Sequence, residues 1–159
     1  MIEKLLNEYQ KATKQLIKRK IPVRIADYWQ CDPRPDTATL YIGCLMTGET
    51  VRCMPDYLDK TFVCKFDFEE IYPWMLAFLH EIGHIATYPE LPQKFRTIRR
   101  QNCTPTQYRL QPIEYLADKW AVTFLNEHFT TALKIQAKLE TLYANISLQE
   151  LEQYIDSLA

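Results

Sequence analysis

The feature that most constrains this chain is a short apolar run that leads directly into His80 and Glu81, with a second histidine, His84, one helical turn further on. Pro73 suits the start of a helix, so the spacing predicts a largely buried helix over 74–86. The apolar run is about half as long as a membrane span, so this helix is expected in the core of a soluble fold. Because burying two imidazoles and a carboxylate without partners would be costly, the fold must supply partners for them.

The chain before this helix is predicted to form one helix followed by several strands. Apolar residues at helical spacing predict a helix over 2–19, which Pro22 ends. A hairpin turn is predicted at 47–49 from Thr-Gly-Glu. Four segments that are β-rich or alternate between apolar and polar residues are predicted as strands: 23–29, 39–45, 51–54 and 61–68.

Only helices are expected in the C-terminal half. A helix over 113–127 is predicted after a polar, proline-punctuated stretch, and two further amphipathic helices close the chain. Ser147 with Glu150 three residues later marks the start of the last helix, because this spacing is that of a capping box. The element order predicts an α+β fold, with an N-terminal helix, a small antiparallel sheet of three to four strands and then helices.

No repeat, low-complexity tract or linker divides the sequence. Residues 1–159 are therefore expected to form a single domain, with the helices from about residue 130 as an appendage to it.

Charge and cysteine content exclude several classes of protein. The 159 residues carry 19 basic and 20 acidic side chains, a net charge of −1, so neither nucleic-acid binding nor membrane association is expected. The N-terminus enters a charged amphipathic pattern rather than a signal peptide, which predicts a cytoplasmic location. The five cysteines lack CxxC spacing, and in a reducing compartment they are expected to be small buried apolar residues.

The sequence His-Glu-Ile-Gly-His at 80–84 carries the clearest chemical signal. Its two histidines lie on one helix face, about 6 Å apart along the axis, so both imidazoles can reach one ion. Imidazole nitrogen is a preferred ligand of zinc, and one zinc ion per chain is expected. Glu81 follows His80 round the helix, where it can reach a metal-bound water as general base. This is the HExxH arrangement of zinc peptidases.

A catalytic zinc also needs a third protein ligand and an open position. Glu114 is the strongest candidate, because Asp118 and Ala121 share its helix face. Asp118 can accept a hydrogen bond from the far nitrogen of a ligating histidine, and the small Ala121 lets two helices approach. Two alternatives remain open: Glu90, six residues after the second histidine, and His128.

The motif HEIGH followed by E-x-x-A-D-x-x-A from Glu114 resembles the gluzincin metallopeptidases, and most of all the ImmA/IrrE-type peptidases of bacteria and their mobile elements. The resemblance covers roughly residues 1–128. It implies a minimal zincin-like fold that runs helix, small sheet, HExxH helix and ligand helix. It also implies the roles of the site residues: ligands His80, His84 and Glu114, general base Glu81 and supporting carboxylate Asp118.

The leading hypothesis is a zinc-dependent metallo-endopeptidase that acts on a protein or peptide substrate. The resemblance suggests a bacterial or phage regulator as that substrate. A rival hypothesis is a non-catalytic, zinc-stabilised interaction module. A third is that the motif is accidental and binds no metal. The presence of Glu81 favours catalysis, since a purely structural zinc site has no use for a general base.

The surroundings of the motif suggest further roles. Tyr88 and Tyr108 are candidate donors to the oxyanion of the reaction. The predicted strand at 61–68 is expected to form a sheet edge along which an extended peptide could pair. The stretch 90–112 is rich in arginine and lysine, and it is either a solvated loop or a lid or docking surface for an acidic partner.

Overall fold

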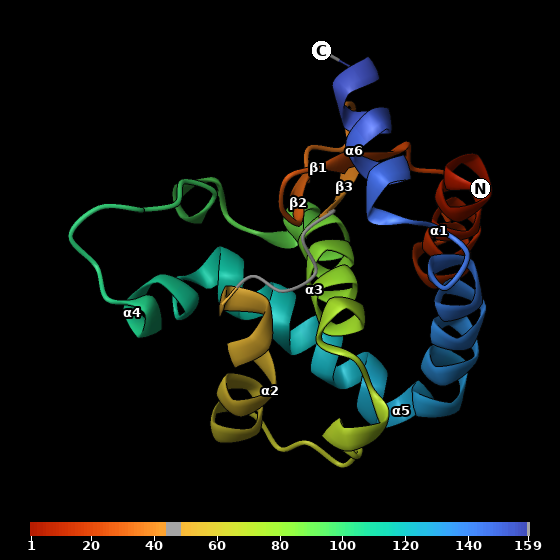
Figure 1. Ribbon diagram of the computed structural model, residues 1–159. Coiled ribbons are helices and arrows are strands. Elements are labelled where there is room, and N and C mark those ends of the chain that lie inside the picture. The colour runs from red at the N-terminus through yellow and green to blue at the C-terminus, as the bar shows by residue number, and fades with distance from the viewer. Residues whose placement is uncertain (44–48, 159) are drawn as a thin grey trace.

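The computed structural model describes residues 1–43 and 49–158, with the backbone alone for 49–52. A helix precedes a three-stranded sheet, and helices make up most of the remaining chain (Figure 1). The strands are β1 (Val23–Ala26), β2 (Gln30–Asp32) and β3 (Thr39–Gly43). The helices are α1 (Ile2–Ile17), α2 (Glu49–Thr61), α3 (Pro73–Thr87), α4 (Pro105–Arg109), α5 (Pro112–Tyr143) and α6 (Leu148–Ser157). Short 3-10 turns are η1 (Phe68–Glu70), η2 (Tyr88–Glu90) and η3 (Gln93–Phe95).

This layout confirms the predicted α+β class, with one correction to the sheet. The strand order is β1-β3-β2, and β3 pairs in parallel with β1 but antiparallel with β2. The sheet is therefore mixed rather than wholly antiparallel. The reason is that the chain reverses between β1 and β2, and β3 then returns between them, so that it runs in the direction of β1. β1 and β2 are the two edges of the sheet.

Two predicted strands are absent from this sheet. Residues 51–54 belong to α2, which runs through Pro55. The segment 61–68 is helical at both ends, since Thr61 ends α2 and Phe68 begins η1, and the residues between them pair with no strand. Two backbone groups of this connection instead pair with the side chain of Asn126 on α5. Its Nδ2 donates to the carbonyl of Val63 at 2.9 Å, and its Oδ1 accepts from the amide of Lys65 at 2.7 Å. Residues 44 and 45 of the predicted strand over 39–45, and most of the turn at 47–49, lie outside the described residues.

Helix α3 lies at the centre of the molecule and contacts the sheet, α1, α2 and α5 (Figure 1). Its residues from Trp74 to Ile85 are all buried. Gly83 faces α5 so closely that a Cβ at this position would lie 2.5 Å from the carbonyl oxygen of Ala117. A side chain at 83 would push the two helices apart, so this glycine sets the distance between α3 and α5.

The C-terminal half was predicted to form a helix over 113–127 and two further helices, but the first two of these are one long helix, α5. α5 continues to Tyr143, although the backbone of His128 leaves helical geometry with φ −135° and ψ 41°. The second half of α5 packs against α1 and contributes Ala132, Ile135 and Leu139 to the core. α6 begins where the capping pattern predicts it, with Ser147 Oγ accepting from the amide of Glu150 at 3.1 Å. Among the described helices, none combines the length and apolar character that crossing a bilayer requires.

The cysteines do not behave as the predicted buried apolar residues. Cys31, Cys53, Cys64 and Cys103 are free thiols, and none of these four is fully buried. Cys31 and Cys64 pack against the core from partly buried positions, whereas Cys53 is exposed. The fifth cysteine, Cys44, lies outside the described residues.

Candidate metal centre

Helix α3 brings the histidines and glutamate of the motif together in the interior. His80, Glu81 and His84 are all buried, and their ligand atoms lie within 4.8 Å of one another. Neutral imidazole nitrogens and a carboxylate at these separations could hold a metal ion. The helix therefore places the three side chains as the i, i+1, i+4 spacing predicts.

Glu114 reaches the same point from the first turn of α5. Its Oε2 lies 2.9 Å from Nε2 of His80 and 3.3 Å from Nε2 of His84. Pro112 at the first helical position fixes where α5 begins, and the resulting register turns Glu114 toward α3. Two imidazole nitrogens thus face one carboxylate oxygen, and all three side chains are buried. Imidazole nitrogen and carboxylate oxygen are among the donors that bind metal ions such as zinc in proteins.

The electrostatics of this cluster reflect the close contact. Burial raises the pKa of Glu114, but hydrogen bonds and charge from His80 and His84 outweigh burial and hold it well below its usual range. Burial would lower the pKa of His80, but the carboxylates of Asp118 and Glu114 raise it well above its usual value. The cluster therefore favours an ionised carboxylate and attracts positive charge.

Asp118 supports His80 from one turn further along α5. It is completely buried, and its Oδ1 lies 2.6 Å from Nδ1 of His80. A proton on Nδ1 that is donated to Asp118 leaves Nε2 free to act as a ligand. His84 lacks such support, because its buried Nδ1 has no hydrogen-bond partner among the described residues.

Arg109 is a site residue that the sequence analysis assigned only to a basic stretch. Its Nη2 donates to both carboxylate oxygens of Asp118, each at 3.0 Å. Its guanidinium lies 4.3 Å from the centre of the Tyr57 ring, and its side chain is only 15% exposed. Thr104, through a capping box with Gln107, fixes the start of α4 and so positions Arg109 at its end. The sequence signal for this contact is Asp118 itself, since a buried carboxylate requires a cationic partner.

We expect Arg109→Met to lower the free energy of unfolding of the metal-free protein by about 1–3 kcal/mol, because the buried carboxylate of Asp118 loses a charged donor. Urea denaturation measures the effect. Arg99→Met is the matched control, because Arg99 is exposed and its loss should change stability by less than about 0.5 kcal/mol. Equal stability of the two variants would show that the Arg109–Asp118 contact contributes nothing.

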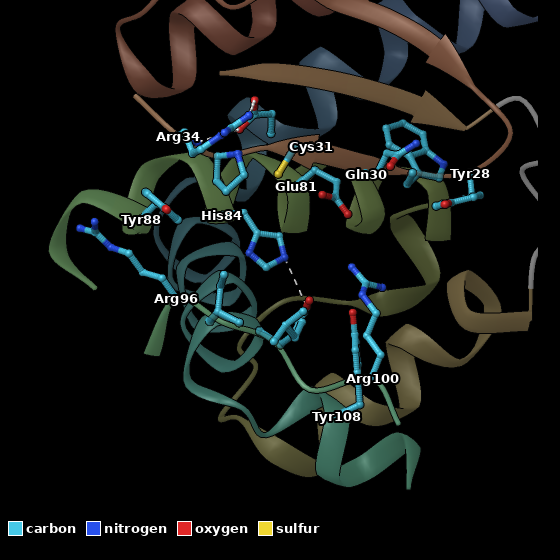
Figure 2. Close-up of a pocket in the computed structure, with 16 residues that line it drawn as sticks. Tyr28, Gln30, Cys31, Arg34, Glu81, His84, Tyr88, Arg96, Arg100 and Tyr108 are labelled. Carbon is cyan, nitrogen blue, oxygen red and sulfur yellow. Dashed lines mark hydrogen bonds and ion pairs between the residues drawn. The ribbon is translucent and has the colours of Figure 1, made fainter. Parts of the chain in front are cut away.

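The cluster opens onto a pocket of about 480 Å³ (Figure 2). Strand β2 and the residues on either side of it form one wall, and the segment between α3 and α5 forms the other. Glu81 and His84 line its interior, together with Glu114. The predicted base, Glu81, and two of the predicted ligands, His84 and Glu114, therefore face a molecule that enters the pocket.

Both candidate tyrosines line this pocket. Burial, the charge of Glu114 and a hydrogen bond to it raise the pKa of Tyr108 to about 12, so its hydroxyl remains a donor at neutral pH. The ring of Tyr88 instead supports the guanidinium of Arg96 at 4.6 Å. Tyr108 is thus the one that contacts the cluster.

Cys31 is a second residue whose place in the site was not predicted. It lies on β2 and points into the pocket near Glu81 (Figure 2). Burial raises the pKa of its thiol well above the usual value, and the nearby Glu81 adds to the shift. Cys31 is therefore a neutral thiol that fills part of the wall beside the proposed base.

The two alternative third ligands lie elsewhere. Glu90 is an exposed residue of η2, and His128 is exposed at the irregular point of α5, where its ring packs 5.4 Å from that of Phe124. The group of potential ligands found among the described residues is His80, Glu81 and His84, so it contains none of the three candidates. Of the three candidates, only Glu114 contacts both motif histidines.

Comparison of the chain with protein-family models, with curated proteins and with solved structures finds no match.

Proposed function

We propose that this chain is a zinc-dependent metallo-endopeptidase that hydrolyses peptide bonds of a protein substrate. The observation that carries the proposal is the meeting of His80, His84 and Glu114 at one buried point, with Glu81 beside it on the wall of an open pocket. A structural zinc site would be closed by a fourth protein ligand, whereas a catalytic one keeps a position for water.

Each residue of the cluster has a distinct task in this proposal. Bound zinc would lower the pKa of its water and polarise the scissile carbonyl. His80 and His84, through Nε2, and Glu114, through Oε2, would hold the ion. Glu81 accepts the proton of the attacking water on its carboxylate and later passes it to the leaving amine nitrogen. Asp118 and Arg109 hold His80 in the tautomer that leaves Nε2 free.

Tyr108 is the better candidate for the donor that stabilises the oxyanion. Its hydroxyl lies in the pocket beside Glu114, whereas the contact that Tyr88 makes is between its ring and the guanidinium of Arg96. A preorganised phenolic donor in a partly dehydrated pocket stabilises negative charge that develops on the carbonyl oxygen.

The substrate backbone would pair with the edge strand β2. This strand has β3 on one side only, and Gln30, Cys31 and Asp32 all line the pocket. An extended peptide can add to such an edge through main-chain hydrogen bonds. β2 thus takes the role that the sequence analysis gave to residues 61–68, which belong to no sheet. Because the two motifs of the chain resemble those of the ImmA/IrrE peptidases, the substrate that we propose is a bacterial or phage regulator.

Metal analysis of the purified protein tests this proposal. We expect about one zinc ion per chain, and none in His80→Ala or His84→Ala, because each removes a nitrogen that faces Glu114. His128→Ala is the matched control, since it removes the third histidine of the chain from an exposed position and should keep full occupancy. Full zinc occupancy in both motif variants would remove the basis of the proposal.

A further inference from the structure

The pocket beside the metal cluster contains an arginine that no acidic group in the described chain neutralises. We propose that this residue, Arg100, makes the site selective for peptides with a carboxylate side chain near the scissile bond. The inference rests on the proposed peptidase function and adds the class of substrate.

The three arginines that line this pocket have different surroundings. Arg34 forms a two-pronged ion pair with Asp32, with Nε 3.0 Å and Nη2 2.9 Å from its carboxylate oxygens. Arg96 donates from Nε to the carbonyl of Leu91 at 2.9 Å and lies over the ring of Tyr88. Arg34 is therefore neutralised, while Arg96 is held in place but keeps its charge.

Arg100 makes no hydrogen bond or ion pair with any residue that the structure describes. Figure 2 shows its side chain extending with that of Tyr108 into the pocket, toward the wall where Glu81 lies. A guanidinium offers up to five donors in a planar fork that matches a carboxylate. Because this fork faces the pocket with no internal acceptor, an acidic substrate side chain can supply the missing partner.

The backbone next to Arg100 is fixed rather than free. The side chain of Gln111 accepts a hydrogen bond from the amide of Arg99 at 2.6 Å and donates one to its carbonyl at 2.8 Å. The same Gln111 amide donates to the carbonyl of Tyr108 at 3.2 Å. Gln111 precedes α5, so these contacts join the loop to the helix that carries Glu114. The backbone on which Arg100 lies is thus tied to this helix, while its side chain is exposed at the mouth of the pocket.

The net charge of the pocket also favours a substrate with an acidic side chain. The Asp32–Arg34 pair is neutral. The carboxylates of Glu81 and Glu114 would together balance one divalent ion, which leaves the positive charges of Arg96 and Arg100. A site with this excess attracts an anionic side chain and repels a cationic one.

Peptide hydroxamates test the inference without requiring turnover, because the hydroxamate group binds zinc directly. Two sets of short peptide hydroxamates are made, with the variable residue next to the hydroxamate in one set and one position further away in the other. Within each set the variable residue is glutamate, glutamine or lysine. Calorimetry with the zinc-loaded protein measures the affinities. In at least one set we expect glutamate to bind about tenfold more tightly than glutamine, and lysine to bind more weakly still.

Two variants with the same change of charge identify the residue responsible. Arg100→Gln should abolish the difference between glutamate and glutamine. Arg99→Gln should keep it, because Arg99 does not line the pocket. Acetohydroxamate, which has no peptide side chain, should bind all three proteins equally.

The possible results separate this inference from the proposed function. If acetohydroxamate and the peptides all fail to bind the zinc-loaded protein, the proposed function fails, and the inference fails with it. If the peptides bind but glutamate shows no advantage in either set, the inference alone is overturned. It is also overturned if Arg99→Gln removes the preference as completely as Arg100→Gln.

Discussion

Glu81→Gln is expected to lower the rate of peptide-bond cleavage by about 100- to 10,000-fold while the protein keeps its zinc and its fold. The substitution preserves the size of the side chain but leaves no carboxylate to accept the proton of the attacking water. Because the lost interaction acts mainly in the transition state, affinity for substrate should change little. Glu90→Gln, at an exposed glutamate outside the pocket, is the matched control and should cleave at the original rate.

The inactive variant also provides a route to the substrate. Glu81→Gln protein is mixed with a bacterial or phage lysate, and the captured proteins are then treated with the unchanged enzyme. Cleavage by the unchanged enzyme but not by the variant supports catalysis. If captured proteins are never cut, or are cut equally by both, a zinc-stabilised interaction module is the better account.

Glu114→Gln is expected to weaken zinc binding by more than the roughly 10- to 100-fold that is typical of losing a partner outside the coordination sphere. Its Oε2 contacts Nε2 of both motif histidines, and an amide is a poor substitute for a charged ligand. Competition with a chromogenic chelator measures the affinity.

Two exposed positions provide the comparison for that result. Glu90→Gln and His128→Ala remove the alternative third ligands, and both should bind zinc as the unchanged protein does. Damage confined to Glu90→Gln would mean that the helix carrying Glu114 does not complete the site, and that another ligand geometry applies.

Local patterns predict the helices of this fold better than its strands. α1, α3 and the start of α6 follow from helical spacing, from Pro73 and from the Ser147 cap. The strand predicted at 61–68 is wrong, because the alternation of apolar and polar residues indicates half-burial and not pairing with another strand. The carbonyl of Val63 and the amide of Lys65 pair with the side chain of Asn126, which is about sixty residues away and leaves no mark on the local pattern.

In the candidate site, too, the sequence predicts local arrangement but not contacts between distant segments. His80 and His84 share a helix face, as do Glu114 and Asp118, so 3.6-residue periodicity is enough to predict that each pair points one way. The meeting of the two pairs is visible in the structure, and the role of His80, His84 and Glu114 as metal ligands stays a prediction. Arg109 could not be placed from the sequence, because its contact with Asp118 depends on where the loop between α3 and α5 returns.

Gly83 and Ala117 mark the point where α3 and α5, the two helices that carry the proposed ligands, come into close contact. Since the proposed ligands come from two helices that meet at this point, an ion held by both would bind the native state and not the unfolded one. At a free concentration 1,000 times its dissociation constant, such an ion adds about 4 kcal/mol to stability. Depletion of the ion would therefore enlarge the unfolded fraction that cellular proteases remove, so that the abundance of this protein would follow the metal status of the cell.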